Sequence, residues 1–199
     1  MFDFNSNLTP DNKEIYEMLP YLSSVNVCAG LYTGKATDIL KFAEYATKNE
    51  IAIGVLVNLK NTNNDEEIKS DVIYQISAVE GFLTTFGLKI ENVRLEGESY
   101  NKFNSDKDFA IKVANAIKHV NPWFNIILNN AEIKTLLEKE LSAKCALEAD
   151  FTDKTSIREL REKENVPETL HFENLDNLKR AYDVLKPTPI TYNRVAKGL

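Results

Sequence analysis

Short apolar segments and amphipathic helical segments alternate along most of the chain. Residues 1–7 (MFDFNSN) alternate apolar and polar positions with a period of two, which is typical of a half-buried β-strand. Residues 51–58 (IAIGVLVN) form an almost continuous apolar run, which is typical of a strand covered on both faces. The same reading predicts strands at 1–7, 24–30, 51–58, 92–98, 124–129 and 145–151, and helices at 11–19, 36–49, 66–86, 106–120, 131–141 and 173–185.

Each predicted strand except the last is followed promptly by a helix, which indicates right-handed βα crossovers and a mainly parallel sheet. The fold class is therefore α/β. This order fits a β/α barrel and an open doubly wound sheet equally well, and in both folds functional side chains gather at the carboxyl ends of the strands. The alternation weakens after residue 151. Residues 152–170 are rich in charged residues, and we expect them to be irregular.

Polar side chains are frequent at the predicted carboxyl ends of the strands. Asp3, Asn5 and Asn7 share one face of the first strand, because side chains alternate between the two faces of a strand. The other polar residues near strand ends are Asn26, Asn58, Glu96, Glu98, Asn129, Asn130 and Asp150. We therefore expect a polar site at this end of the sheet.

The fourth strand carries the densest group of charges. Arg94, Glu96 and Glu98 share the face opposite Val93 and Leu95. In a narrow barrel that face points inward, and Arg94 and Glu96 would form a buried ion pair there. In an ordinary sheet the same side chains form a solvated edge or structural ion pairs, and the pattern alone does not choose between the two arrangements.

Composition and charge narrow the class of protein. The 199 residues suffice for one domain with a full core, so we expect a single domain over 1–199. The net charge of −6 comes with scattered lysines and no basic stripe, which argues against a nucleic-acid partner. No apolar run approaches the roughly 18–20 residues that span a bilayer, and residues 1–3 open no signal peptide. We therefore expect no membrane partner and a cytoplasmic location.

Residues that commonly bind metals are few. Cys28 and Cys145 each lie in an apolar, strand-like run, which is typical of buried and reduced thiols. His119 and His171 are the only histidines, and neither stands near a second His or a Cys at ligand spacing. We therefore expect neither a metal site nor a cofactor.

The segment SVNVCAGLYTGK at 24–35 resembles the motif Ser-x-Asn-Ile-Ala-Cys-Gly-Phe-His-Ala-Gly-Asp of the LamB/YcsF family, to which the A subunit of the bacterial ATP-dependent 5-oxoprolinase belongs. DFNSNLTP at 3–10 is similar to its Asp-Leu-Asn-x-Asp-x-Gly-Glu. Residues 73–101 are similar to its Tyr-Gln-Ile-Gly-Ala-Leu helix and the following Val-Lys-Pro-His-Gly-Ala-Leu-Tyr-Asn strand. FTDK at 151–154 and LHFENL resemble its Phe-Ala-Asp-Arg and His-Asp-Pro-Glu segments. This collinear resemblance implies the seven-stranded β/α barrel shared with glycoside hydrolases and polysaccharide deacetylases.

The sequence departs from the family pattern at residues that could carry acid–base chemistry. The His positions of three family motifs are Tyr32, Leu56 and Glu96 here, and the Asp of the second motif is Lys35. Histidine is the easiest general base to supply near neutral pH, and Leu56 can neither transfer a proton nor bind a metal. The motif residues that remain are Asp3, Asn5, Asn26, Gly30, Gly34, Gly97, Tyr100, Asn101 and Asp153.

Two functions are consistent with this pattern. In the first, the protein is a degenerate family member, a barrel that binds a small-molecule ligand or a partner such as other 5-oxoprolinase-type subunits, without opening a lactam ring. In the second, it is an active hydrolase on 5-oxoproline or a related cyclic amide or carbohydrate. Asp3 and Glu96, with Glu98 and Asp150 as further candidates, would supply the acid–base pair, and Arg94 would hold a substrate carboxylate. The expected ligand-binding residues are Asn5, Asn7, Asn26, Tyr32, Asn58, Glu98, Tyr100, Asn129 and Asp150.

The last clear strand ends at Phe151, and the chain ends short of the usual family length. The resemblance therefore implies that the final strand, with its His-Gly-Asp, is missing and that the barrel of six or seven strands is incompletely closed. The first strand would then keep an unpaired edge, which proteins usually cover. Residues 190–195 (ITYNRV) or a second copy of the chain would cover it, so we expect a homodimer with this tail at or near the interface.

Overall fold

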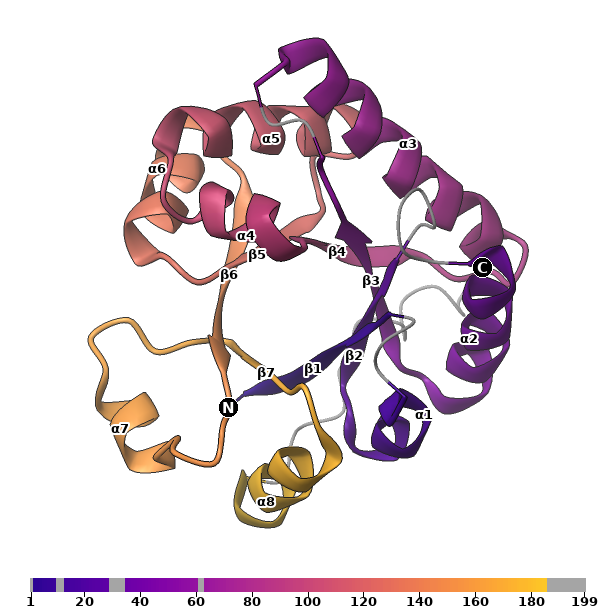
Figure 1. Ribbon diagram of the computed structural model, residues 1–199, viewed down its shortest axis with the longest axis vertical. Coiled ribbons are helices and arrows are strands. Elements are labelled where there is room, and N and C mark those ends of the chain that lie inside the picture. The colour runs from indigo at the N-terminus through magenta and orange to yellow at the C-terminus, as the bar shows by residue number, and fades with distance from the viewer. Residues whose placement is uncertain (1, 10–12, 29–34, 61–62, 186–199) are drawn as a thin grey trace.

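Seven parallel strands form a closed barrel in the computed structural model, which describes residues 2–9, 13–28, 35–60 and 63–185 (Figure 1). The strands are β1 (Asp3–Leu8), β2 (Ser24–Cys28), β3 (Ala52–Val57), β4 (Ile90–Leu95), β5 (Asn125–Leu128), β6 (Lys144–Asp150) and β7 (Thr169–His171). The helices are α1 (Ile15–Met18), η1 (Leu19–Tyr21), α2 (Ala36–Asn49), α3 (Asp65–Thr84), α4 (Gly97–Phe103), α5 (Lys107–Val120), α6 (Ala131–Leu141), α7 (Ile157–Glu162) and α8 (Leu175–Leu185). The α/β prediction is confirmed, and the barrel is the arrangement found.

Several helix boundaries follow the sequence closely because capping residues fix them. α6 begins at Ala131, where the Asn130 side chain accepts hydrogen bonds from the backbone N–H groups of Glu132 (2.8 Å) and Ile133 (3.3 Å). Asn64 caps α3 in the same way. In the described part of the chain, no helix is long and apolar enough to cross a bilayer.

The closure of the barrel corrects the prediction of an open edge. β7 starts at the end of segment 152–170, which the sequence pattern left irregular, and it pairs in parallel with both β6 and β1. Its register places Thr169 beside Asp3 and His171 beside Asn5. β1 therefore has partners on both sides, and the reason for expecting a homodimer disappears. Residues 190–195, predicted to cover the edge, lie outside the described residues.

The end of β4 also differs from the prediction. The strand stops at Leu95 instead of continuing to Glu98, and Gly97 adopts a φ of +57°, in the left-handed region that glycine tolerates best. α4 starts at this residue, with Glu96 at its N-cap. Glu98 consequently lies in the first turn of α4, exposed to solvent, and does not share a strand face with Arg94.

The interior of the barrel is polar, whereas the main apolar core lies outside it. Strand residues such as Val93, Leu95 and Leu170 belong to the cluster that packs with the helices. The opposite strand faces point inward and carry the buried polar residues Asn5, Asn26, Asn92, Arg94, Glu148, Thr169 and His171. Of the two arrangements that the sequence left open for Arg94, the structure therefore shows the inward one.

Candidate ligand site at the carboxyl end of the barrel

A buried ion pair between β4 and β6 forms the centre of the site. Arg94 Nε donates to both carboxylate oxygens of Glu148, at 2.8 and 3.1 Å, and Arg94 Nη2 lies 2.7 Å from Glu148 Oε1. The side chains are 8% and 1% exposed, respectively. Arg94 Nη1 also donates to the backbone carbonyl of Leu95 at 3.1 Å. A two-pronged contact of this kind holds both groups in one orientation.

Two further side chains surround the Glu148 carboxylate. The Tyr100 hydroxyl, from α4, donates to Glu148 Oε1 at 2.9 Å, and the Arg94 guanidinium lies 4.1 Å from the centre of the Tyr100 ring. His171 Nδ1, from β7, lies 3.9 Å from Glu148 Oε2 and makes no hydrogen bond within the described part of the chain. Four elements, β4, α4, β6 and β7, therefore meet at one carboxylate.

The electrostatics of this network keep its protonation states constant around neutral pH. Burial alone would raise the pKa of Glu148, but the charge of Arg94, the nearby His171 and the hydrogen bonds of Arg94 and Tyr100 bring it below its usual value. Burial, reinforced by the Arg94 charge, lowers the pKa of His171 to about 4, so that the imidazole is neutral. Burial raises the pKa of Tyr100, and the neighbouring Glu148 charge raises it further.

The predicted ion pair between Arg94 and Glu96 is wrong. Arg94 pairs with Glu148 instead, and Glu96 Oε2 accepts a hydrogen bond from Asn58 Nδ2 at 3.1 Å. Arg94 and Glu148 are 54 residues apart, so no local pattern in the sequence joins them. The available signal was the period-two alternation of β6, which puts Glu148 on one face with Asp150.

An open pocket of about 470 Å³ lies beside this network, between the ends of β5 and β6 and the α7 region. Its lining residues are Asn129, Glu148, Ala149, Asp150, Thr155, Ser156, Glu159, Leu160 and Lys163. Desolvation and then the neighbouring Glu148 charge raise the pKa of Asp150. Asn129 and Asp150 are thus the predicted residues that the fold places in this pocket, and the α7 contribution was missed because its segment lacks a clear pattern.

Three predicted asparagines form a hydrogen-bonded layer inside the barrel. Asn26 Nδ2 donates to Asn5 Oδ1 at 3.0 Å and to Asn7 Oδ1 at 2.9 Å. Asn5 and Asn26 are completely buried. Tyr32, the remaining predicted ligand-binding residue, lies outside the described residues.

The predicted catalytic residues do not converge on one site. Asp3 starts β1 and lines a separate cavity at the amino end of the barrel, where burial raises the pKa of its carboxyl. Glu96 directly follows the carboxyl end of β4. Because the strands are parallel, Asp3 and Glu96 lie at opposite ends of the barrel.

The thiols are only partly as predicted. Cys28 is buried, whereas Cys145 is half-buried, and neither forms a disulfide within the described residues. Burial raises the pKa of the Cys145 thiol to about 12, so it is protonated at neutral pH. Among the described residues, no group of three or more His, Cys, Asp or Glu side chains is arranged to hold a metal ion.

The sequence model of the LamB/YcsF family matches residues 5–161, which is most of the chain. The chain belongs to the LamB/YcsF family. The barrel also superposes on the crystal structure of the lactam utilization protein from Thermus thermophilus, with a TM-score of 0.71 and 21% sequence identity over 90% of this chain and 93% of that one. At this identity the likeness concerns the fold, and it agrees with the β/α barrel implied by the resemblance.

Curated relatives match this LamB/YcsF chain over most of its own length. It is 31% identical over 149 residues to the 5-oxoprolinase A subunit of Bacillus mycoides (strain KBAB4), covering 70% of this chain and 58% of the relative. It is 28% identical over 147 residues to the 5-oxoprolinase A subunit of Histophilus somni (strain 129Pt), covering 69% of this chain and 60% of the relative. The chain therefore spans less than two thirds of the length of these relatives.

Proposed function

We propose that this LamB/YcsF protein is a ligand-binding barrel that has lost the hydrolytic activity of the 5-oxoprolinase A subunit, and that it binds a small amide or lactam in the pocket beside Glu148. The observation that carries this proposal is the closed network of Arg94, Glu148 and Tyr100. Its charges are paired and its hydrogen bonds are made within the protein.

The network offers no group suited to proton transfer at neutral pH. A general acid or base works best when its pKa is near the working pH. Glu148 stays ionised because its pKa is lowered, His171 stays neutral because its pKa is about 4, and Arg94 is permanently charged. Leu56, which stands at a family His position, lies inside the barrel beside Arg94 in the strand register. These features support binding without catalysis.

The pocket suits a small molecule that carries an N–H group and a carbonyl. The Asp150 carboxylate would accept a hydrogen bond from the N–H, while Lys163 or the Asn129 amide would donate to the carbonyl. Arg94 is already bound to Glu148, so the role of substrate-carboxylate holder that the sequence suggested for it falls to Lys163 in this proposal. The names of the relatives make 5-oxoproline the first ligand to examine.

The alternative, an active hydrolase using Asp3 and Glu96, receives less support. Those two carboxyl groups lie at opposite ends of the barrel and would not act on one substrate. Asp150 is the candidate acid–base group with the better position, because its pKa is raised and it lines the pocket. Association with other 5-oxoprolinase-type subunits belongs to the proposal as well, since the relatives are named as one subunit of that enzyme.

Isothermal titration calorimetry with 5-oxoproline and with the neutral lactam 2-pyrrolidinone tests this function. We expect saturable binding to the wild type that Asp150→Ala weakens by about tenfold or more, because a hydrogen bond to a charged group is lost. Asp176→Ala, which removes an exposed carboxylate in the first turn of α8, should bind as the wild type does. Absence of saturable heat with both compounds, or binding unaffected by Asp150→Ala, would refute the proposal.

A further inference from the structure

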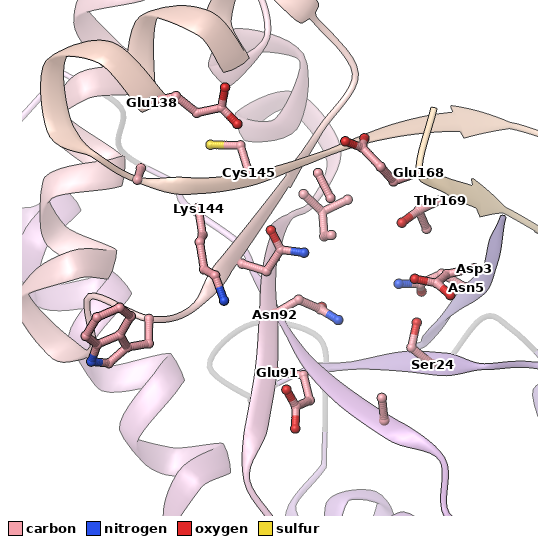
Figure 2. Close-up of a pocket in the computed structure, with 16 residues that line it drawn as sticks. Asp3, Asn5, Ser24, Glu91, Asn92, Glu138, Lys144, Cys145, Glu168 and Thr169 are labelled. Carbon is pink, nitrogen blue, oxygen red and sulfur yellow. The ribbon is translucent and has the colours of Figure 1, made fainter. Parts of the chain in front are cut away.

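A second cavity, of about 460 Å³, lies at the amino end of the barrel (Figure 2). It is lined by residues at or next to the starts of several strands, so it is separated from the pocket beside Glu148 by the interior of the barrel. Its size falls within the range of about 300–1,000 Å³ that small-molecule sites occupy. Barrel enzymes carry their chemistry at the other end, so this cavity is not explained by the site described above.

Part of the polar lining of this cavity has no hydrogen-bond partner among the described residues. In the described part of the chain, six lining side chains make no hydrogen bond: Asp3, Ser24, Glu91, Asn92, Asn125 and Thr169. In the network around Glu148, by contrast, the carboxylate has partners, because Arg94 and Tyr100 both bind it. Buried polar groups normally have partners, and a cluster of unpaired groups in one cavity points to a bound molecule.

Asn92 is the most informative of these residues. The residue is 7% exposed, and its side-chain Oδ1 is buried without a hydrogen-bond partner among the described residues. Figure 2 shows it pointing into the cavity toward the side of Asp3, Asn5 and Ser24. The neighbouring Asn5 is fully buried, and its Nδ2 is also without a partner in the described chain. An amide that is kept this deep and unpaired is costly unless a ligand or water satisfies it.

The chemistry of the lining selects the class of ligand. Asn92, Ser24 and Thr169 offer hydrogen-bond donors, while the Asp3 and Glu91 carboxylates offer acceptors. Of the four carboxylates and one lysine in the lining, Glu138 and Glu168 are paired with Lys134, outside the lining, which leaves Asp3 and Glu91 as acceptors beside Lys144. An anion would be repelled by this net negative lining, and an organic cation would leave the amide and hydroxyl donors unpaired. Hydroxyl groups both donate and accept, so a neutral polyhydroxylated molecule matches the whole set.

The mouth of the cavity adds an aromatic surface. Trp123, between α5 and β5, lines the cavity and is 76% exposed, although tryptophan usually buries most of its area. A sugar ring has an apolar C–H face beside its hydroxyls, and an exposed indole beside polar groups suits both parts. We propose that this cavity is a second binding site, specific for a neutral mono- or disaccharide.

The single tryptophan provides the measurement. Trp123 is the only one in the chain, so its fluorescence reports directly on the mouth of this cavity. The full chain is titrated with glucose, galactose, N-acetylglucosamine, maltose and cellobiose, and with choline and inorganic phosphate as charged probes. We expect a saturable change in emission with at least one neutral sugar and none with choline or phosphate.

Variants connect that signal to the cavity. Asn92→Leu should weaken sugar binding by about tenfold or more, because a buried amide pairing is lost, and Asn115→Leu on the exposed face of α5 should not change it. Thr169→Val is the milder second variant if Asn92→Leu fails to fold, and it should weaken binding in the same direction.

Three results would overturn the inference. In the first, none of the five sugars gives a saturable response. In the second, choline or phosphate gives one instead. In the third, a folded Asn92→Leu or Thr169→Val variant responds to sugar as the wild type does. The first result would assign the cavity to water alone. Because this experiment uses other ligands and other residues than the lactam titration, either proposal can fail without the other.

Discussion

The Glu148 carboxylate lies inside the barrel and accepts hydrogen bonds from Arg94 and Tyr100. The sequence placed Arg94 on the face opposite Val93 and Leu95, because side chains alternate along a strand, but it left open whether that face points into the barrel. It did not predict the partner, because the nearest carboxylate in the chain, Glu96, lies past the end of β4 and binds Asn58. The contact between Arg94 and Glu148 depends on how the closed barrel brings the inward faces of β4 and β6 together, and no local sequence pattern contains that information.

Breaking the pair from one side should strongly destabilise the protein. In Arg94→Met, the Glu148 carboxylate stays buried without its counter-charge, so we expect the free energy of unfolding to fall by about 3–5 kcal/mol. The double variant Arg94→Met/Glu148→Leu leaves no buried charge and should recover most of this loss. Urea denaturation at pH 7 measures both, with Arg158→Met in the exposed Arg158–Glu162 pair as a control that keeps the wild-type midpoint. An Arg94→Met protein as stable as the wild type would contradict the buried pair.

His171 should make stability depend on pH. The unfolded chain takes up a proton at this residue near pH 6.5, whereas in the fold its pKa is about 4, because burial disfavours the charged form. The unfolded state therefore binds more protons between these values, and lowering the pH from 7 to 5 should reduce the free energy of unfolding by about 2 kcal/mol through this residue.

Urea denaturation of His171→Gln at the two pH values tests this dependence. The variant should lose less stability than the wild type on going from pH 7 to pH 5. His119→Gln, which changes the exposed histidine of α5, should follow the wild-type curve. Equal pH dependence in wild type and His171→Gln would show that His171 is not buried as described.

At the scale of elements, β3 contains a glycine that its neighbours require. A Cβ added at Gly54 would lie 1.8 Å from Asn92 Oδ1 and 2.2 Å from Asn26 Oδ1. Gly54→Ala should therefore cost about 1–3 kcal/mol of unfolding free energy, because the buried amides must move. Gly81→Ala is the matched control: nothing lies within 4 Å of its added Cβ in α3, and it should stabilise the protein by about 0.5–1 kcal/mol. Thermal unfolding of the two variants compares them, and equal melting temperatures would contradict the described barrel interior.

Elements with a long periodic pattern were predictable, whereas short elements were not. α2 and α6 have the predicted bounds. β7 has only three residues, too few to show alternation, and it becomes a strand because β6 and β1 pair with it on either side. α4 was missed because the turn at Gly97 interrupts a segment whose apolar pattern continues the strand.

At the scale of the whole molecule, the two ends of the barrel differ in how their polar groups are satisfied. The carboxyl end contains a closed charge network beside an open pocket, and the amino end contains a cavity in which part of the polar lining is unpaired among the described residues. The sequence predicted the gathering of polar residues at the carboxyl strand ends, but it assigned Asp3 to that site. Alternation along a strand tells which face Asp3 lies on, but not which end of the barrel it is near. Asp3 lies at the amino end because it is the first residue of β1.

Turnover of 5-oxoproline tests directly whether this barrel binds without hydrolysing, as we propose. The protein is incubated with 5-oxoproline, ATP and the partner subunits of the 5-oxoprolinase of Bacillus mycoides, and glutamate is measured against a reaction without the protein. The A subunit of that organism in its place is the positive control. Because no group of the Glu148 network has a pKa near neutral pH, we predict no glutamate above background at pH 7. Glutamate formation that Asp150→Asn or Glu96→Gln abolishes would show instead that the protein is a working hydrolase.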